Sequence, residues 1–125
     1  MDNTPQYIES YRIMKSTTAV TTLAALAQDT RLRIYRELVR THDPVSENKG
    51  TPVGDLVKKL KVAPATLSFH LKELTNAKLI SSKRVGRSIL YRANFATMQA
   101  LVEHLLEDCC SGACGVVVAT ATEKA

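Results

Sequence analysis

The stretch PATLSFHLKELTNAKLI, residues 64–80, carries the most regular pattern in this chain of 125 residues. Three leucines recur there at spacings of four and three, which predicts a helix over residues 64–76 with one apolar face: Leu67, Leu71 and Leu74. Pro64 suits the first turn of that helix, because the N–H group that it lacks would have no partner there. We expect the outer face to present Thr66, Ser68, Phe69, His70 and Lys72.

A second short helix is predicted just before this one. Thr51 followed by Pro52 is typical of a helix start, and Leu56, Val57 and Leu60 supply an apolar face. The connection to the next helix is about four residues long. Two short helices joined in this way, the second with a polar outer face, are typical of a helix-turn-helix.

The pattern changes from helix to strand after this helix pair. Residues 79–84 and 88–92 are predicted as two strands, with residues 85–87 as the turn, in which Gly86 can adopt the positive φ that a hairpin needs. A hairpin directly after a helix-turn-helix is typical of a winged helix, so we call residues 79–92 the wing. Its basic residues near the tip are Lys83, Arg84 and Arg87.

The remaining segments complete a mainly α fold with one small β-hairpin. Further helices are expected over residues 7–14, over residues 17–28, after an N-cap at Asp29, and after an N-cap at Asn94. Their expected apolar residues are Tyr7, Ile8, Tyr11, Met14, Val20, Leu23, Ala24, Ala27, Leu32, Tyr35, Leu38, Val39, Met98, Leu101, Val102 and Leu105. The polar residues 41–50 are expected to form a loop. We therefore predict a winged helix and dimerisation domain over residues 1–108, followed by a cysteine-bearing tail over residues 109–125.

Basic residues concentrate in the middle of the chain. Residues 58–92 hold nine basic side chains and one acidic one, within a net charge of +5 for the whole chain. A stretch of nearly one sign favours contact with a polyanion over an ordinary solvated surface, which would mix the signs. Because the major groove of DNA accepts one helix, the candidate DNA contacts are Thr66, Ser68, Phe69, His70, Lys72, Lys83, Arg84 and Arg87. An ordinary surface or capping histidine is the alternative for His70.

The composition favours a cytoplasmic protein that dimerises. No apolar run approaches the roughly 20 residues that span a bilayer, and the polar start Met-Asp-Asn-Thr-Pro has no signal-peptide pattern. We therefore expect no membrane contact, and nothing in the sequence indicates an organic cofactor. Aromatic residues make up 5% of the chain and Trp is absent, so the small core is expected to gain stability by pairing with a second copy.

Three segments of the chain, taken together, are typical of one family. They are residues 65–80, residues 26–34 (LAQDTRLRI) and residues 84–92 (RVGRSILYR). They resemble the recognition-helix segment, an earlier helix start and the wing of the ArsR/SmtB family of metal-responsive repressors, and the likeness extends over about residues 20–107. The resemblance implies a homodimer, built through the first and last helices, that binds an inverted-repeat operator and leaves it when an inducer binds.

Two inducer sites of that family are absent or incomplete in this chain. The cysteine pair of the best-known arsenic site would fall near residues 51–56 (TPVGDL), which contain no cysteine. His104 and Glu107 match one half of a zinc pattern, but the other half is missing near residues 94–98. Zinc is therefore not favoured as the inducer.

The only cysteines are Cys109, Cys110 and Cys114, just past the predicted last helix. They are similar to those of an arsenic-responsive subset of the family, with a vicinal cysteine pair and a third cysteine after the last helix. Trivalent arsenic is soft and prefers three thiolates in a pyramid, and soft sulfur ligands select soft centres. The expected inducer is therefore As(III), with Sb(III) or a trivalent organoarsenical as related ligands, bound by these three thiolates.

Other functions of the three cysteines are open at this point. An odd number within six residues is not a disulfide framework, but thiols in a reducing cytosol can act as a redox switch, for example through a Cys110–Cys114 disulfide. A small thiol reductase would need an easily formed thiolate, which Glu107 and Asp108 at a helix C-terminus oppose. We therefore expect that the chain is not an enzyme. Three incidental, buried cysteines are the remaining alternative.

Overall fold

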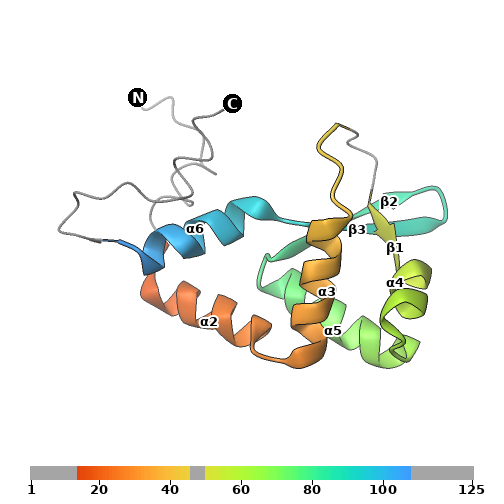
Figure 1. Ribbon diagram of the computed structural model, residues 1–125, viewed down its shortest axis with the longest axis horizontal. Coiled ribbons are helices and arrows are strands. Elements are labelled where there is room, and N and C mark those ends of the chain that lie inside the picture. The colour runs from red at the N-terminus through yellow and green to blue at the C-terminus, as the bar shows by residue number, and fades with distance from the viewer. Residues whose placement is uncertain (1–13, 46–49, 108–125) are drawn as a thin grey trace. The chain divides into compact units, whose positions relative to one another are not determined.

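The computed structural model describes residues 14–45 and 50–107 (Figure 1). The chain divides into two compact units, one formed by Thr21–Asn94 and the other by Met1–Val20 with Phe95–Ala125. The helix predicted over residues 7–14 and the three cysteines lie outside the described residues.

The unit Thr21–Asn94 contains a helix-turn-helix followed by a hairpin. Its complete elements are α3 (Asp29–Arg40), β1 (Thr51–Pro52), α4 (Val53–Leu60), α5 (Pro64–Asn76), β2 (Ile80–Val85) and β3 (Ser88–Ala93). The strands form one antiparallel sheet in the order β1-β3-β2. This arrangement confirms the predicted fold class, a mainly helical winged helix-turn-helix.

Helix α5 has the bounds that its leucine pattern predicts. Leu67, Leu71 and Leu74 are at most 2% exposed and form the apolar face of the helix. They share the core of this unit with other almost fully buried residues of α3, α4, the turn before β2 and the first residue of β2: Ile34, Leu38, Leu56, Leu79 and Ile80. Burial of each large aliphatic side chain contributes about 1.5–3 kcal/mol, so this face holds the helix-turn-helix together.

A tight turn leads from α5 into the hairpin. Lys78 has a left-handed φ of 62°. The N–H of Leu79 donates to the carbonyl of Leu74 at 3.0 Å, and the N–H of Lys78 donates to that of Thr75 at 2.9 Å. These two bonds define a Schellman motif, which satisfies the last carbonyls of a helix. The turn fixes the point at which the wing begins.

The hairpin matches its prediction, except that the sheet has a third strand. Gly86 has a φ of +63° in the turn between β2 and β3, as expected. Thr51 and Pro52 pair with Tyr91 and Leu90 as strand β1, so the prediction that they start a helix was wrong. Helix α4 begins one residue later, because this short strand extends the sheet through partners that are distant in sequence.

The buried face of α3 differs from the predicted one. Its N-cap is Gln28, whose side-chain oxygen accepts the N–H of Arg31 at 3.0 Å, and not Asp29. Leu32 and Val39 are 46% and 38% exposed, although both were expected to be buried. Ile34 and Glu37 are buried in their place. The helix is therefore rotated towards a face that includes a carboxylate, which apolar residues alone do not reveal.

Helices α2 (Ser16–Leu26) and α6 (Phe95–Leu105) exist as predicted, with small shifts in their bounds. Their larger apolar residues are only partly buried. Val20 is 65% and Leu23 is 41% exposed on α2, and Leu105 is 56% exposed on α6. Small residues such as Ala19 and Ala25 are buried in α2 instead, while Leu101 is buried in α6 as expected. Across the described residues, every helix is too short or too polar to cross a bilayer.

We predict that Gly50→Ala destabilises the protein by about 1–3 kcal/mol, the usual cost of overpacking. An added Cβ at Gly50 would lie 2.8 Å from the Cβ of Leu90 and 3.2 Å from the carbonyl oxygen of Tyr91, so the edge of the sheet would have to move. Gly54→Ala in α4 is the matched control, because its Cβ would meet nothing within 4 Å and alanine favours helix. Urea unfolding measures both variants, and equal midpoints would contradict the prediction.

A second prediction concerns the buried Tyr35. Its side chain is 6% exposed, its hydroxyl has no partner among the described residues, and burial raises the pKa of Tyr35 to about 12. Between about pH 10 and 12 the unfolded chain loses this proton while the folded protein keeps it, so stability falls as the pH rises. Tyr35→Phe should reduce this fall and be at least as stable at pH 7. If the unfolding free energies of the wild type and of Tyr35→Phe fall equally as the pH rises, Tyr35 does not contribute to the pH dependence.

Candidate nucleic-acid interface

The outer face of α5 is polar and solvent-exposed. Thr66, Ser68 and Lys72 are exposed, and Phe69 is 53% exposed. These four residues lie opposite the buried leucines of the same helix. The core therefore determines which side chains α5 presents to a partner.

A short turn joins α4 to α5, and a hydrogen bond ties α3 to the end of α4. Lys61 ends α4 in the left-handed conformation, with a φ of 57° and a ψ of 47°. Arg33 of α3 donates from Nη2 to the carbonyl of Leu60 at 2.8 Å, which satisfies a group at the end of α4. Arg33 is therefore a structural residue of the helix-turn-helix.

His70 does not lie on the exposed face, where we expected it. Its side chain is 8% exposed, and its Nδ1 accepts the Nε–H of Arg31 at 3.1 Å. Burial lowers the pKa of His70, the positive charge of Arg31 lowers it further, and Glu73 opposes the shift. The expectation of exposure was wrong because residue 70 follows Leu67 by three and precedes Leu74 by four, which puts it on the leucine stripe.

Arg31 is the residue at this surface that the site prediction omitted. Its guanidinium carbon lies 5.7 Å from the centroid of the Phe69 ring, which is in the range of a cation–π contact. The rings of Phe69 and His70 are 5.5 Å apart in an edge-on arrangement. Arg31 belongs to α3, so only the tertiary fold brings it next to the outer face of α5.

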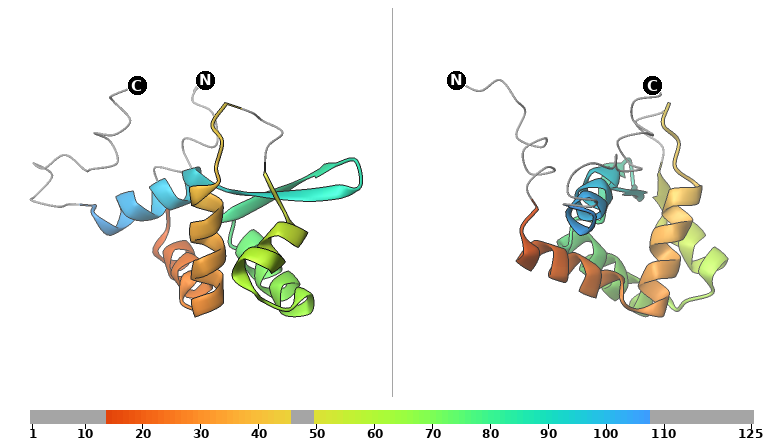
Figure 2. Two further views of the ribbon diagram at one scale, coloured as in Figure 1. Left: turned by 45° about the vertical axis from the view of Figure 1, so that its right-hand side comes forward. Right: turned by 60° about the vertical axis from the view of Figure 1, so that its left-hand side comes forward.

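The wing presents the predicted basic residues on β2 and in the turn that follows it. In β2, Lys83 and Arg84 pair with Leu90 and Ile89 of β3, and Lys83, Arg84 and Arg87 are exposed. The left view of Figure 2 shows the hairpin as a long ribbon that projects past α4 and α5. Basic side chains near its tip are therefore accessible to a partner of the helix-turn-helix.

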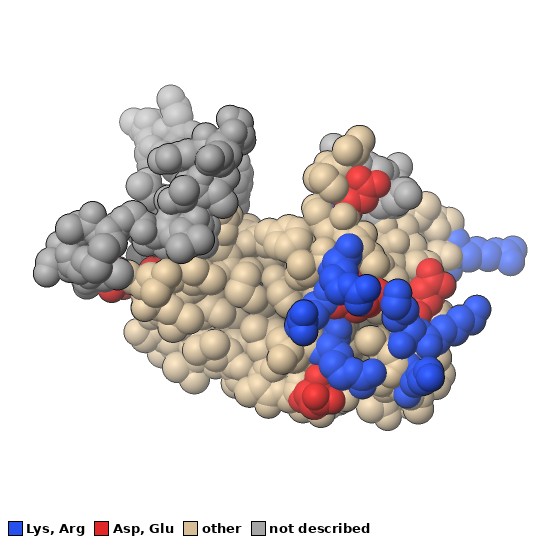
Figure 3. Space-filling view, viewed as in Figure 1, with Lys and Arg blue, Asp and Glu red and all other residues tan. Residues whose placement is uncertain are grey.

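Some basic residues of this unit pair with an acidic side chain and are therefore less available to a binding partner. In the view of Figure 3, Lys and Arg gather over α3 and α4, with acidic side chains among them. Glu37 is 5% exposed and pairs with Arg40 at 3.0 Å and with Lys59 at 3.3 Å. These two cations stabilise a buried carboxylate, so their first role is structural.

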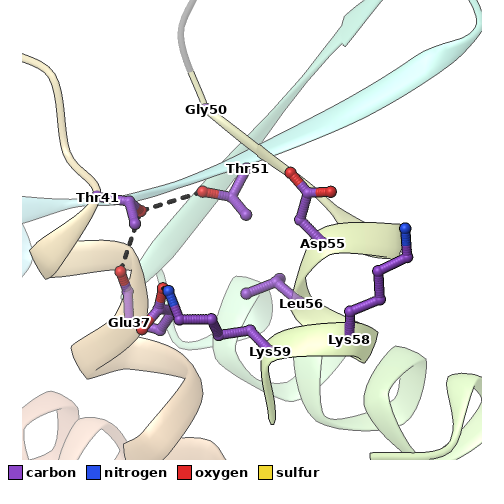
Figure 4. A pocket seen from close by; sticks show the side chains of 8 residues that line it. All are labelled: Glu37, Thr41, Gly50, Thr51, Asp55, Leu56, Lys58 and Lys59. Carbon is purple, nitrogen blue, oxygen red and sulfur yellow. Dashed lines mark hydrogen bonds and ion pairs between the residues drawn. The ribbon is translucent and has the colours of Figure 1, made fainter. Parts of the chain in front are cut away.

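A pocket of about 540 Å³ lies beside this ion-pair group (Figure 4). Its lining residues are Glu37, Thr41, Gly50, Thr51, Asp55, Leu56, Lys58 and Lys59. The Thr41 hydroxyl donates to the Glu37 carbonyl at 3.0 Å and lies 3.1 Å from the Thr51 hydroxyl.

Within residues 14–45 and 50–107, no group of three or more His, Cys, Asp or Glu residues is placed to hold a metal ion. His104 Nδ1 lies 3.8 Å from Glu107 Oε1 within α6 and the turn after it. This pair is the half-site noted in the sequence. The candidate ligands Cys109, Cys110 and Cys114 lie outside the described residues and stay a prediction.

Comparison with known proteins identifies the helix-turn-helix independently. A family model described as a helix-turn-helix domain matches residues 26–82. The HTH-type transcriptional regulator YdfF of Bacillus subtilis is 40% identical over 55 residues, which are 44% of this chain and 24% of the relative. The regulator MJ1398 of Methanocaldococcus jannaschii is 35% identical over 66 residues, 53% of this chain and 15% of the relative. The matches thus span less than a quarter of the length of these curated relatives, both of which are described as uncharacterised.

Solved structures extend the likeness to most of the chain. HlyU from Vibrio cholerae superimposes with a TM-score of 0.58 and 26% identity, over 79% of this chain and all of that one. A homodimeric winged helix-turn-helix DNA-binding domain from Mycobacterium bovis, a possible ArsR-family regulator, gives a TM-score of 0.56 at 20% identity, over 86% of this chain and 92% of that one.

The fold is therefore that of winged helix-turn-helix regulators, and the chain carries a helix-turn-helix domain over residues 26–82. The curated relatives that it matches are described as transcriptional regulators and not as enzymes. This supports the expectation from the sequence that the chain is not an enzyme.

Proposed function

We propose that this protein is a transcriptional repressor that binds an inverted-repeat operator as a homodimer and is released from it by trivalent arsenic. The observation that carries the DNA-binding part is the exposed polar face of α5, which is set by the buried leucines of the same helix and accompanied by a basic wing. A helix-turn-helix with such a face places its second helix in the major groove.

Each element of this surface has a defined task in the proposed complex. Thr66, Ser68 and Lys72 can donate hydrogen bonds to base edges or phosphates, and Phe69 can contact a thymine methyl group. Arg84 and Arg87 near the tip of the wing can contact the backbone or enter the minor groove. His70 and Lys83 are the other two predicted contacts. Because His70 is buried, it would affect DNA binding through a neighbouring residue and not by touching DNA itself.

The proposed homodimer is supported by apolar side chains that the single chain leaves exposed. Val20 and Leu23 on α2 and Leu105 on α6 are each more than 40% exposed. Exposed apolar groups are typical of surfaces that bury themselves against a partner. The Mycobacterium bovis neighbour, of similar fold, is described as homodimeric. A regulator that acts on DNA in this way would work in the cytoplasm.

The proposed sensor is the set of thiolates of Cys109, Cys110 and Cys114, which follow α6 in the sequence. Three sulfur ligands match the preference of As(III), and Sb(III) or a trivalent organoarsenical presents the same chemistry. Binding would reorganise the chain just after a helix that is part of the dimer in the proposed assembly. A coupling of roughly 1–3 kcal/mol between the two sites would weaken DNA binding about 5- to 150-fold.

A redox-sensing regulator is the second candidate function. The specific observation in its favour is the spacing of Cys110 and Cys114, which allows a disulfide across a four-residue step. An oxidant, and not arsenite, would then release the DNA, and a thiol reductant would restore binding. The two functions share the same DNA-binding surface and differ only in the signal.

We predict that the wing supplies salt-dependent affinity. The probe is a duplex of roughly 30 base pairs, selected by the wild-type protein from a random pool and long enough for two half-sites. The logarithm of the binding constant falls as the logarithm of the salt concentration rises, and each lost phosphate contact makes this slope less steep by about 0.9. The double variant Arg84→Gln and Arg87→Gln should therefore have a slope that is less steep by about 2 per wing. The control is Arg36→Gln on α3, with the same charge loss per substitution. An unchanged slope in the wing variant would mean that the wing does not touch DNA.

We predict that arsenite releases the reduced protein from this duplex and that each of Cys109→Ser, Cys110→Ser and Cys114→Ser abolishes the response. Titrations with zinc and with peroxide serve as comparisons, and DNA binding without inducer should stay unchanged in all three variants. An intact response in Cys114→Ser would indicate a two-thiolate site, which suits an organoarsenical. Release by peroxide, with no effect of arsenite, would establish the redox function instead.

A further inference from the structure

Arg31 connects α3 to the outer face of α5 through two contacts. Its Nε–H donates to Nδ1 of His70 at 3.1 Å, and its guanidinium lies 5.7 Å from the centroid of the Phe69 ring. His70 is buried, whereas Phe69 is 53% exposed. The guanidinium is therefore held by a buried acceptor and lies beside an exposed ring.

Among residues 14–45 and 50–107, most of the hydrogen-bonding capacity of Arg31 remains unused. A guanidinium has five N–H donors in a rigid plane, and the bond to His70 takes the single donor on Nε. In the part of the chain that the structure describes, no acidic side chain pairs with Arg31. A fixed, charged fork with unpaired terminal amino groups is the arrangement that binds a phosphate through two parallel hydrogen bonds.

We propose that Arg31 is a phosphate contact of the DNA interface and that His70 is the positioning residue which holds it there. The inference rests on the proposed DNA-binding function and adds to it a residue outside α5 and the wing. Phosphates line both edges of the major groove that would receive α5. An arginine already fixed beside that helix loses little side-chain freedom when it binds one of them.

This role accounts for a buried polar residue in the middle of a leucine stripe. The bond needs a neutral His70, because a protonated Nδ1 could not accept from Arg31. Burial and the charge of Arg31 both act to keep the ring neutral. His70 then influences DNA binding through Arg31, without reaching a base itself.

The experiment is a double-mutant cycle on the selected duplex, measured at several salt concentrations. Arg31→Gln removes the phosphate contact, so we expect about a tenfold loss of affinity. The slope of log K against log salt should become less steep by about 0.9 per subunit. His70→Phe keeps an aromatic side chain at this position but removes the acceptor, so it should reproduce much of both effects. The double variant should bind no more weakly than Arg31→Gln. His70→Phe would only disturb the position of a phosphate contact that Arg31→Gln has already removed.

Two matched variants separate positioning from general packing. His70→Asn offers an amide oxygen near the position of Nδ1, so its salt slope should stay close to that of the wild type. If urea unfolding shows that His70→Phe is unstable, the salt slope of His70→Asn still tests the proposal. Arg36→Gln removes the same charge on a side of α3 that is about 140° away from Arg31. His70→Phe should therefore keep its full effect in an Arg36→Gln background.

The free protein offers a readout that does not need DNA. In an NMR titration, the pKa of His70 should rise in Arg31→Gln, because a neighbouring positive charge has been removed. An unchanged pKa would show that the two residues do not touch in solution.

The failures of the two proposals are distinguishable. If the wild type binds DNA and Arg31→Gln leaves the salt slope unchanged, this inference is overturned and the proposed function stands. If His70→Phe weakens binding with an unchanged slope, or the double variant loses affinity additively, His70 does not act through Arg31. If the wild type binds no duplex even at low salt, both proposals fail together.

Discussion

The apolar face of α5 is the constraint on which the rest of this structure depends. Leu67, Leu71 and Leu74 are almost completely buried, so the rotation of the helix about its own axis is set by the core. The residues on the opposite side of the helix must then face outwards, whatever their chemistry. Core and candidate interface are two sides of one short helix, and a change in packing on one side reorients the other.

Local patterns were sufficient for those parts of the fold that local chemistry determines. The leucine spacing and Pro64 gave the bounds of α5, and Gly86 gave the hairpin turn, because each depends on residues a few positions apart. Strand β1 was missed because its partners lie about 40 residues away and two residues carry no periodicity. The buried face of α3 was misjudged because it includes Glu37, whose burial depends on Lys59 of another helix.

The same division applies to the candidate interface. The exposure of Thr66, Ser68 and Lys72 followed from the leucine stripe and agrees with the structure. His70 was assigned to the wrong side because its polarity was given more weight than its position three residues after Leu67. The contact between Arg31 and His70 could not have been predicted from the sequence, since 39 residues separate the two.

The exposed length of the hairpin has a mechanical consequence. In β2 only the first residue, Ile80, is buried, and the five that follow are exposed, so the wing has no core of its own beyond its root. A two-stranded hairpin is at best marginally stable on its own, so little packing opposes a change in the shape of its tip. Its tip can follow changes in groove width that the rigidly packed α5 cannot. In a complex with DNA, discrimination between sequences would then come from α5, while the wing would adapt to variation in the shape of the site.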